Sequence, residues 1–153
     1  MRVAMLLLMS CCVLVVSAGG AVAGEEAPSG AAPLPVASSG NITTYSDGNQ
    51  VVAAASFNDC PDGWVCIWEH TNYEGRMLRF QDRGYWQDLS VYEFNDKVSS
   101  WRNRINQDAR LSEHAGGGGS LLCMQPNSSS SGVGGFNDLA SSIRLYKTSD
   151  VCG

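Results

Sequence analysis

Basic side chains are scarce in this sequence of 153 residues. Lys and Arg together number 10, against 15 Asp and Glu, and the formal net charge is −5. Nucleic acids and anionic membrane surfaces are bound through clusters of Lys and Arg. We therefore expect a protein that binds neither nucleic acid nor a membrane.

The sequence also lacks a recognisable catalytic constellation. Its two histidines, His70 and His114, each follow a glutamate, but nothing near them marks a nucleophile. The glycine run 116–119 does not open a helix that carries a Lys, as a phosphate-binding loop would. We therefore expect that the protein is not an enzyme.

Long apolar runs are missing except at the N-terminus. Residues 3–16 are almost entirely apolar, but a transmembrane helix needs about 20 such residues. Arg2 before this run and Ala21-Val22-Ala23 after it are typical of a secretory signal. Cys11 faintly resembles a lipoprotein anchor, but the apolar run continues past it. We expect residues 1–23 to be a signal peptide cleaved after Ala23, and the protein to be extracellular.

Residues 24–56 are rich in Ala, Gly, Ser and Pro and show no sustained helical or strand period. This composition predicts a disordered tail or linker before a domain at 57–153. The short apolar run 51–55 is compatible with an extra strand on that domain, but its surroundings favour the tail.

The four cysteines outside the signal form an even set, which in a small secreted domain predicts two disulfides. Three pairings are possible. We favour Cys60 with Cys66, which brackets a Pro-Asp-Gly turn, and Cys123 with Cys152, which would hold the C-terminus. Loop entropy suggests about 2.4 and 3.7 kcal/mol of stabilisation, respectively. A four-cysteine zinc site is the alternative, and the absence of a second close pair disfavours it.

Two polar hexamers organise the second half of the chain. Residues 95–100, Asn-Asp-Lys-Val-Ser-Ser, recur at 137–142 as Asn-Asp-Leu-Ala-Ser-Ser, and each copy follows a phenylalanine. Glu113-His114 likewise repeats Glu69-His70. The hexamers therefore indicate a tandem repeat.

Short β-rich segments surround the first hexamer. The run 64–68 and the alternating residues 76–80 predict a hairpin, and 100–104 predicts another strand. We expect two helix-free units, at about 60–104 and 108–148. Each is too small to bury its own core, so the pair should form an all-β sandwich.

These motifs resemble the Greek-key unit of the βγ-crystallin superfamily. The resemblance depends on two features of the sequence. One is the hairpin motif from Trp68 to Gly75, in which Tyr73 is the second aromatic residue, and the other is the pair of hexamers. The resemblance implies a βγ-crystallin-like sandwich of two Greek keys. The second hairpin departs from the pattern, with Ser112 in place of Trp68 and Gly117 in place of Tyr73.

The stretch from Cys60 to Glu69, together with residues 94–103, resembles a family of secreted bacterial peptidase inhibitors named for a metalloprotease inhibitor. This resemblance implies that the partner is an extracellular protease. We expect a monomer that inhibits it without being an enzyme.

The superfamily resemblance also implies that the hexamers share two calcium ions. Calcium prefers six to eight oxygen ligands, and the low carboxylate count predicts a modest affinity of about 10⁻⁵ to 10⁻³ M. Alternatively, the Asn and Ser side chains only cap tight turns. The candidate ligands are Glu69, Asp96, Lys97 (carbonyl), Ser99, Glu113, Asp138, Leu139 (carbonyl) and Ser141.

Aromatic residues leave a further function open. Large aromatics dominate the burial in small domains, so at least two of the four tryptophans should lie in the core. Tyr85 and Trp86, in a predicted loop, are candidates for an exposed sugar-binding platform. A carbohydrate or cell-wall binding module, and a calcium-stabilised extracellular structural protein, are therefore the alternatives to an inhibitor.

Overall fold

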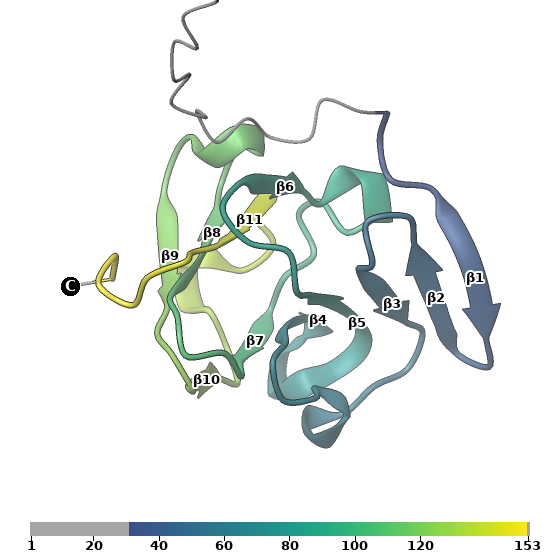
Figure 1. The fold of residues 1–153 in the computed structure, drawn as a ribbon. Helices are drawn as coiled ribbons and strands as arrows, with labels where there is room; N and C mark the ends of the chain where they lie inside the picture. The colour runs from purple at the N-terminus through teal and green to yellow at the C-terminus, as the bar shows by residue number, and fades with distance from the viewer. Residues whose placement is uncertain (1–30, 153) are drawn as a thin grey trace, which may run out of the picture.

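The computed structural model describes residues 31–152, which form two antiparallel sheets packed face to face (Figure 1). The predicted signal peptide and its cleavage site after Ala23 lie outside the described residues. Within residues 31–152 the helices are short 3-10 turns, and none is long and apolar enough to cross a membrane. The all-β prediction is confirmed.

The larger sheet has seven strands in the order β1-β2-β3-β5-β4-β7-β10. Their bounds are Pro35–Ser39, Ile42–Tyr45, Gln50–Val52, Glu74–Phe80, Val65–His70, Ser100–Asn103 and Ser129–Ser130 in that order. The smaller sheet has the order β6-β11-β8-β9. Its strands are Trp86–Asp88, Ser142–Leu145, Ala109–Ser112 and Leu121–Met124. The turns η1 to η5 are Phe57–Asp59, Thr71–Tyr73, Ser90–Tyr92, Ala115–Gly117 and Gly134–Phe136.

The two units exchange one strand each. β6 lies between β5 and β7 in the sequence but pairs with β11 of the second unit. β10 of the second unit pairs with β7 of the first. The predicted hairpin is β4 with β5, and the exchange makes each sheet depend on both units.

The main core lies between the two sheets. Because side chains alternate along a strand, Val65 and Ile67 of β4 face this core, while Cys66 and Trp68 face the other side of the sheet. All four are fully buried. Because both faces of the sheet are covered at β4, the sequence of these four residues is a continuous apolar run. The second cluster, on the outer face, contains Val52, Cys60, Cys66, Trp68 and Met77.

The prediction of a disordered tail at 24–56 is wrong for residues 35–52, which form β1, β2 and β3. β3 pairs with β5, Val51 opposite Leu78 and Val52 opposite Met77. These strands form because of contacts with the rest of the fold. The edge of β5 would otherwise be unpaired, and the segment covers the outer apolar cluster. The possible extra strand at 51–55 is partly right, since Val51 and Val52 belong to β3. We refer to β1–β3 and their turns, residues 33–52, as the N-terminal extension.

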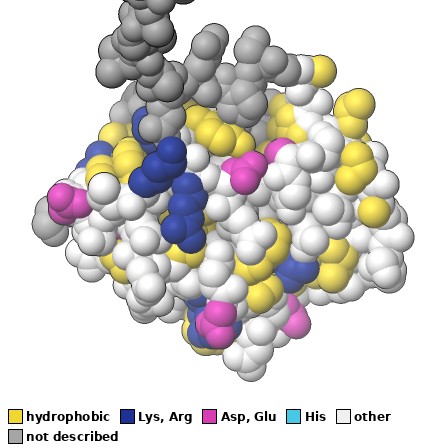
Figure 2. Space-filling view, in the orientation of Figure 1, with side chains coloured by type: hydrophobic (Ala, Val, Ile, Leu, Met, Phe, Trp, Pro, Cys, Tyr) yellow, Lys and Arg dark blue, Asp and Glu magenta, His cyan; other side chains and the backbone are white. Residues whose placement is uncertain are grey.

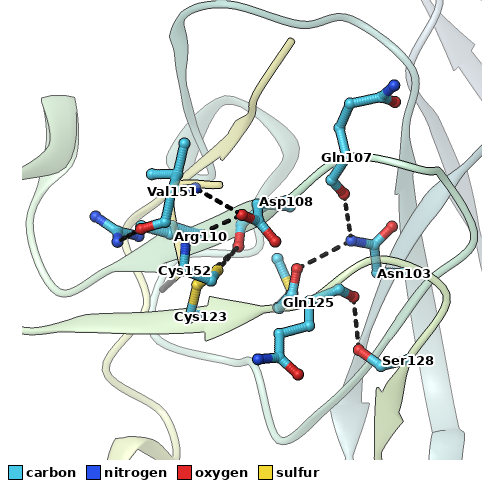
Figure 3. The surroundings of a disulfide bond; sticks show 11 residues. Asn103, Gln107, Asp108, Arg110, Cys123, Gln125, Ser128, Val151 and Cys152 are labelled. Carbon is cyan, nitrogen blue, oxygen red and sulfur yellow. Dashed lines mark hydrogen bonds between the residues drawn. A yellow bond between two sulfur atoms is a disulfide. The ribbon is translucent and has the colours of Figure 1, made fainter. Parts of the chain in front are cut away.

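Both favoured disulfides are present, Cys60–Cys66 and Cys123–Cys152, each with Cα atoms 5.9 Å apart. Figure 3 shows the second one beside Asp108, whose Oδ2 accepts the N–H groups of Val151 (2.8 Å) and Cys152 (2.9 Å). The C-terminal segment is therefore held both by a disulfide and by a buried carboxylate.

The second hairpin replaces its missing aromatic residue through the strand exchange. In the first unit, the rings of Trp68 and Tyr73 meet edge to face at 5.4 Å. In the second unit, Gly117 leaves room for the indole of Trp86, and a Cβ at Gly117 would clash with it. Trp86 belongs to β6, so an aromatic ring from the first unit completes the second.

Candidate functional site

The two hexamers meet and pair reciprocally. The N–H of Asp96 donates to the carbonyl of Ala140 at 2.9 Å, and the N–H of Asp138 donates to the carbonyl of Val98 at 3.2 Å. Both aspartates have left-handed backbones, with φ of 55° and 56°, which Asp adopts more readily than most residues. The sequence repeat is therefore also a local symmetry of the structure.

One half of this face is a surface hollow of about 660 Å³ between the hexamers and the first hairpin. It brings together five of the eight predicted ligand residues: Glu69, Asp96, Lys97, Ser99 and Asp138. The Ser99 hydroxyl donates to the Glu69 carbonyl at 2.8 Å. The hollow is also lined by His70, Thr71 and Asn137, which the ligand prediction did not include.

The carboxylate of Glu69 is already paired. Its Oε1 accepts hydrogen bonds from Arg76 at 2.7 and 3.0 Å, and the ammonium of Lys97 lies 3.8 Å away. The side-chain hydrogen bonds from Arg76 are the main cause that lowers the pKa of Glu69. Glu69 can therefore offer an ion its backbone carbonyl, while its carboxylate holds the hairpin.

The other half of the face is less complete. The Ser141 hydroxyl lies 3.4 Å from Oδ1 of Asp96, which links the second hexamer to the first. Glu113, Leu139 and Ser141 do not line the hollow. The carboxylate of Glu113 accepts the Ser120 N–H at 2.9 Å, and this bond lowers the pKa of Glu113.

Neutral oxygens dominate the donor set of the hollow. Within residues 31–152, no three His, Cys, Asp or Glu side chains cluster closely enough to hold one metal ion. The Glu69 carbonyl, the Ser99 hydroxyl and the Asp138 carboxylate are nevertheless hard oxygen ligands, the kind that calcium prefers. The residues therefore fit calcium in chemical type.

The chain resembles solved βγ-crystallin domains. One solved chain, described as "Evolution of the eye lens beta-gamma-crystallin domain fold", is 25% identical with a TM-score of 0.53, and the match covers 62% of this chain and 95% of that one. A βγ-crystallin domain from Clostridium beijerinckii is 24% identical with a TM-score of 0.48 (56% and 99% covered). A βγ-crystallin from Ciona intestinalis is 23% identical with a TM-score of 0.47 (54% and 99% covered).

No curated protein matches the chain significantly. The family model described as "Peptidase inhibitor family I36" matches residues 53–124. The match begins directly after β3 and ends with β9, so it covers the first Greek-key unit and the start of the second. With its βγ-crystallin fold and this match, the chain is similar to peptidase inhibitor family I36 over residues 53–124.

Proposed function

We propose that this protein is a secreted, non-catalytic peptidase inhibitor that acts as a monomer and binds calcium at its paired hexamers. The observation that carries inhibition is the match of residues 53–124 to the I36 family model. The disulfides and the family are consistent with an extracellular location. The partner is accordingly an extracellular protease.

A braced surface loop supports the inhibitor proposal. The loop 61–64 is closed by the Cys60–Cys66 disulfide, and Asp62 has 88% of its side chain exposed. The backbone N–H of Gly63 donates to the Arg104 carbonyl at 3.0 Å, and the backbone N–H of Arg104 donates to the Trp64 carbonyl at 2.9 Å. A loop fixed in this way loses little conformational entropy on binding.

The loop that follows Cys123 is a second candidate for the contact with a protease. Met124 is fully buried, and Ser128 closes the following turn by donating to the Gln125 carbonyl at 2.6 Å. The accessible part of this loop is therefore residues 125–128. Substitutions in each loop distinguish the two.

The inhibitor proposal is tested with thermolysin-like and subtilisin-like proteases at micromolar concentrations of this protein. We expect dose-dependent slowing of substrate cleavage by at least one class, and loss of the effect after reduction of the disulfides. Chelators would also inactivate the proteases, so calcium dependence is tested with Asp138→Asn instead. No slowing of either class would contradict the proposal.

The calcium proposal is supported by the reciprocal pairing of the hexamers and the oxygen donors of the hollow. If the dissociation constant is about 10⁻⁴ M, calcium at 100 times that value stabilises the fold by about 2.7 kcal/mol. Asp138→Asn should weaken the binding, whereas Asp150→Asn, outside the hollow, should not. A flat calorimetric titration up to millimolar calcium, with no rise in melting temperature, would contradict the proposal.

A further inference from the structure

A second cavity lies away from the hexamers, between the N-terminal extension and the exchanged strand β6. Its volume is about 470 Å³, within the usual range for small-ligand sites. In Figure 2, hydrophobic and acidic side chains lie close together near the part of this face where Figure 1 places β6. Its described lining contains no Lys, Arg or His: Ala31, Ala32, Pro33, Ser46, Asp47, Asp82, Tyr85, Trp86, Gln87, Asp88, Val91 and Tyr92.

Three side chains in the wall of this cavity already donate hydrogen bonds to other residues of the same wall. The Tyr92 hydroxyl donates to Asp47, and the Tyr85 hydroxyl donates to Oδ2 of Asp82 at 3.0 Å. Nε2 of Gln87 donates to the Asp82 carbonyl at 3.0 Å. Burial raises the pKa of both tyrosines above the ordinary value, so both keep their protons at neutral pH.

Acceptors, by contrast, are in excess. Asp82 uses Oδ2 in its contact with Tyr85, and Asp88 uses Oδ1 to accept a backbone N–H at 2.9 Å, which leaves each carboxylate a second oxygen. Asn49, fully buried behind the wall, donates to Asp47, yet its own Oδ1 has no partner. The salt bridges found in residues 31–152 involve none of these carboxylates.

We propose that this cavity binds a guanidinium or ammonium group on an aliphatic chain, as carried by an arginine or lysine side chain of a peptide. A guanidinium brings five donors and no acceptor, which matches a wall with surplus acceptors. Trp86 and Tyr85 attract a cation through their ring faces, and Val91 provides an apolar surface for the stem. A neutral sugar would stack on the same rings but would leave the carboxylate charges uncompensated.

The proposal is tested on the full secreted chain by calorimetry at low ionic strength, with four probes. Agmatine carries a free guanidinium, acetyl-Gly-Arg-Gly-amide carries it on a peptide, and cellobiose and calcium serve as comparisons. We expect agmatine and the peptide to bind, and added salt to weaken both. Tighter binding of the peptide identifies a peptide as the natural source, and equal binding identifies a small amine.

The variant Asp82→Asn/Asp88→Asn keeps the oxygens that Tyr85 and the neighbouring backbone use, but removes two charges. It should weaken agmatine binding about tenfold or more, whereas the matched control Asp150→Asn should leave it unchanged. Circular dichroism checks the fold, and Asp88→Asn alone serves if the double variant unfolds.

Three results would overturn the proposal. These are no binding of agmatine up to tens of millimolar, equal binding by wild type and the folded Asp→Asn variants, or preferential binding of cellobiose, or of calcium in the Asp138→Asn variant, over agmatine. The proposal does not depend on peptidase inhibition, so each outcome can be read separately.

Discussion

Gly117 offers a direct test of how the second hairpin is completed. Gly116 and Gly117 are adjacent, and both have positive φ, 73° and 94°. A Cβ at Gly116 would meet open space, whereas a Cβ at Gly117 would clash with the indole of Trp86. Substitution of each glycine by alanine therefore separates backbone strain from the contact with Trp86.

The two variants should differ in stability by a measurable amount. Gly116→Ala carries only the cost of a left-handed non-glycine residue, about 1–2 kcal/mol. Gly117→Ala has that cost plus overpacking against the half-buried indole of Trp86, typically about 1–3 kcal/mol. We expect Gly117→Ala to lose about 2–5 kcal/mol, and each kcal/mol to lower the melting temperature by roughly 4 °C.

Urea unfolding with the disulfides intact measures both losses. In the background of Trp86→Ala the clash is absent, so Gly117→Ala should then cost no more than Gly116→Ala. Equal destabilisation of the two single variants would refute the reasoning. So would an undiminished cost of Gly117→Ala in the absence of the indole.

Three further changes test contacts elsewhere in the fold. Arg76 lowers the pKa of Glu69, so this pair stabilises the protein above the ordinary Glu pKa, and the effect disappears as the pH falls through the lowered value. Glu69→Gln should lower the free energy of unfolding by about 1 kcal/mol at neutral pH. Measured by urea unfolding, the stability of the variant should also decrease less at acidic pH than that of wild type. An equal decrease in both proteins would contradict the pairing. Lys97→Met removes a positive charge from the hollow. At an effective distance of about 6 Å in water, the repulsion between this charge and a divalent ion is about 1.4 kcal/mol, so the variant should bind calcium about tenfold more tightly by calorimetry. Weaker binding would contradict the hollow as the site. Asp108→Ala should free the C-terminal segment, seen as faster hydrogen exchange at the amide of Val151. Exchange as slow as in wild type would show that the Asp108 carboxylate is not needed to hold the segment beside the disulfide and the Arg110 contact.

The elements that the sequence predicted are those with a local cause. The alternation at 76–80 and the run at 64–68 mark β5 and β4, and the close Cys60–Cys66 pair suggested its own disulfide. The strand exchange has no local cause, because β6 and β10 choose their partners through the packing of the two units. β1–β3 were missed for a related reason, since their pairing depends on an open edge of β5.

The candidate site was predicted to a similar extent. The repeated hexamers predicted a shared face, and the structure places Glu69, Asp96 and Asp138 around one hollow. Glu113 and Leu139 followed from repeat symmetry, but they lie outside that hollow. The repeat could not reveal that Arg76 forms a hydrogen-bonded ion pair with the Glu69 carboxylate, because that contact lies within the first hairpin.

The contacts of the N-terminal extension argue that the folding unit begins at β1 and not at residue 57. Val52 belongs to the cluster that covers Trp68 on the outer face of the larger sheet. Asn49 of the same extension donates to Gln87 of β6 at 2.7 Å, and so reaches the strand that the first unit gives to the second. Removal of the extension would expose Trp68 and leave buried polar groups unpaired, which costs about 1–3 kcal/mol for each group. The extension, the exchanged strand and the acidic cavity between them therefore form one cooperative structure, and a shortened chain that starts at residue 57 should be less stable and should lose the cavity.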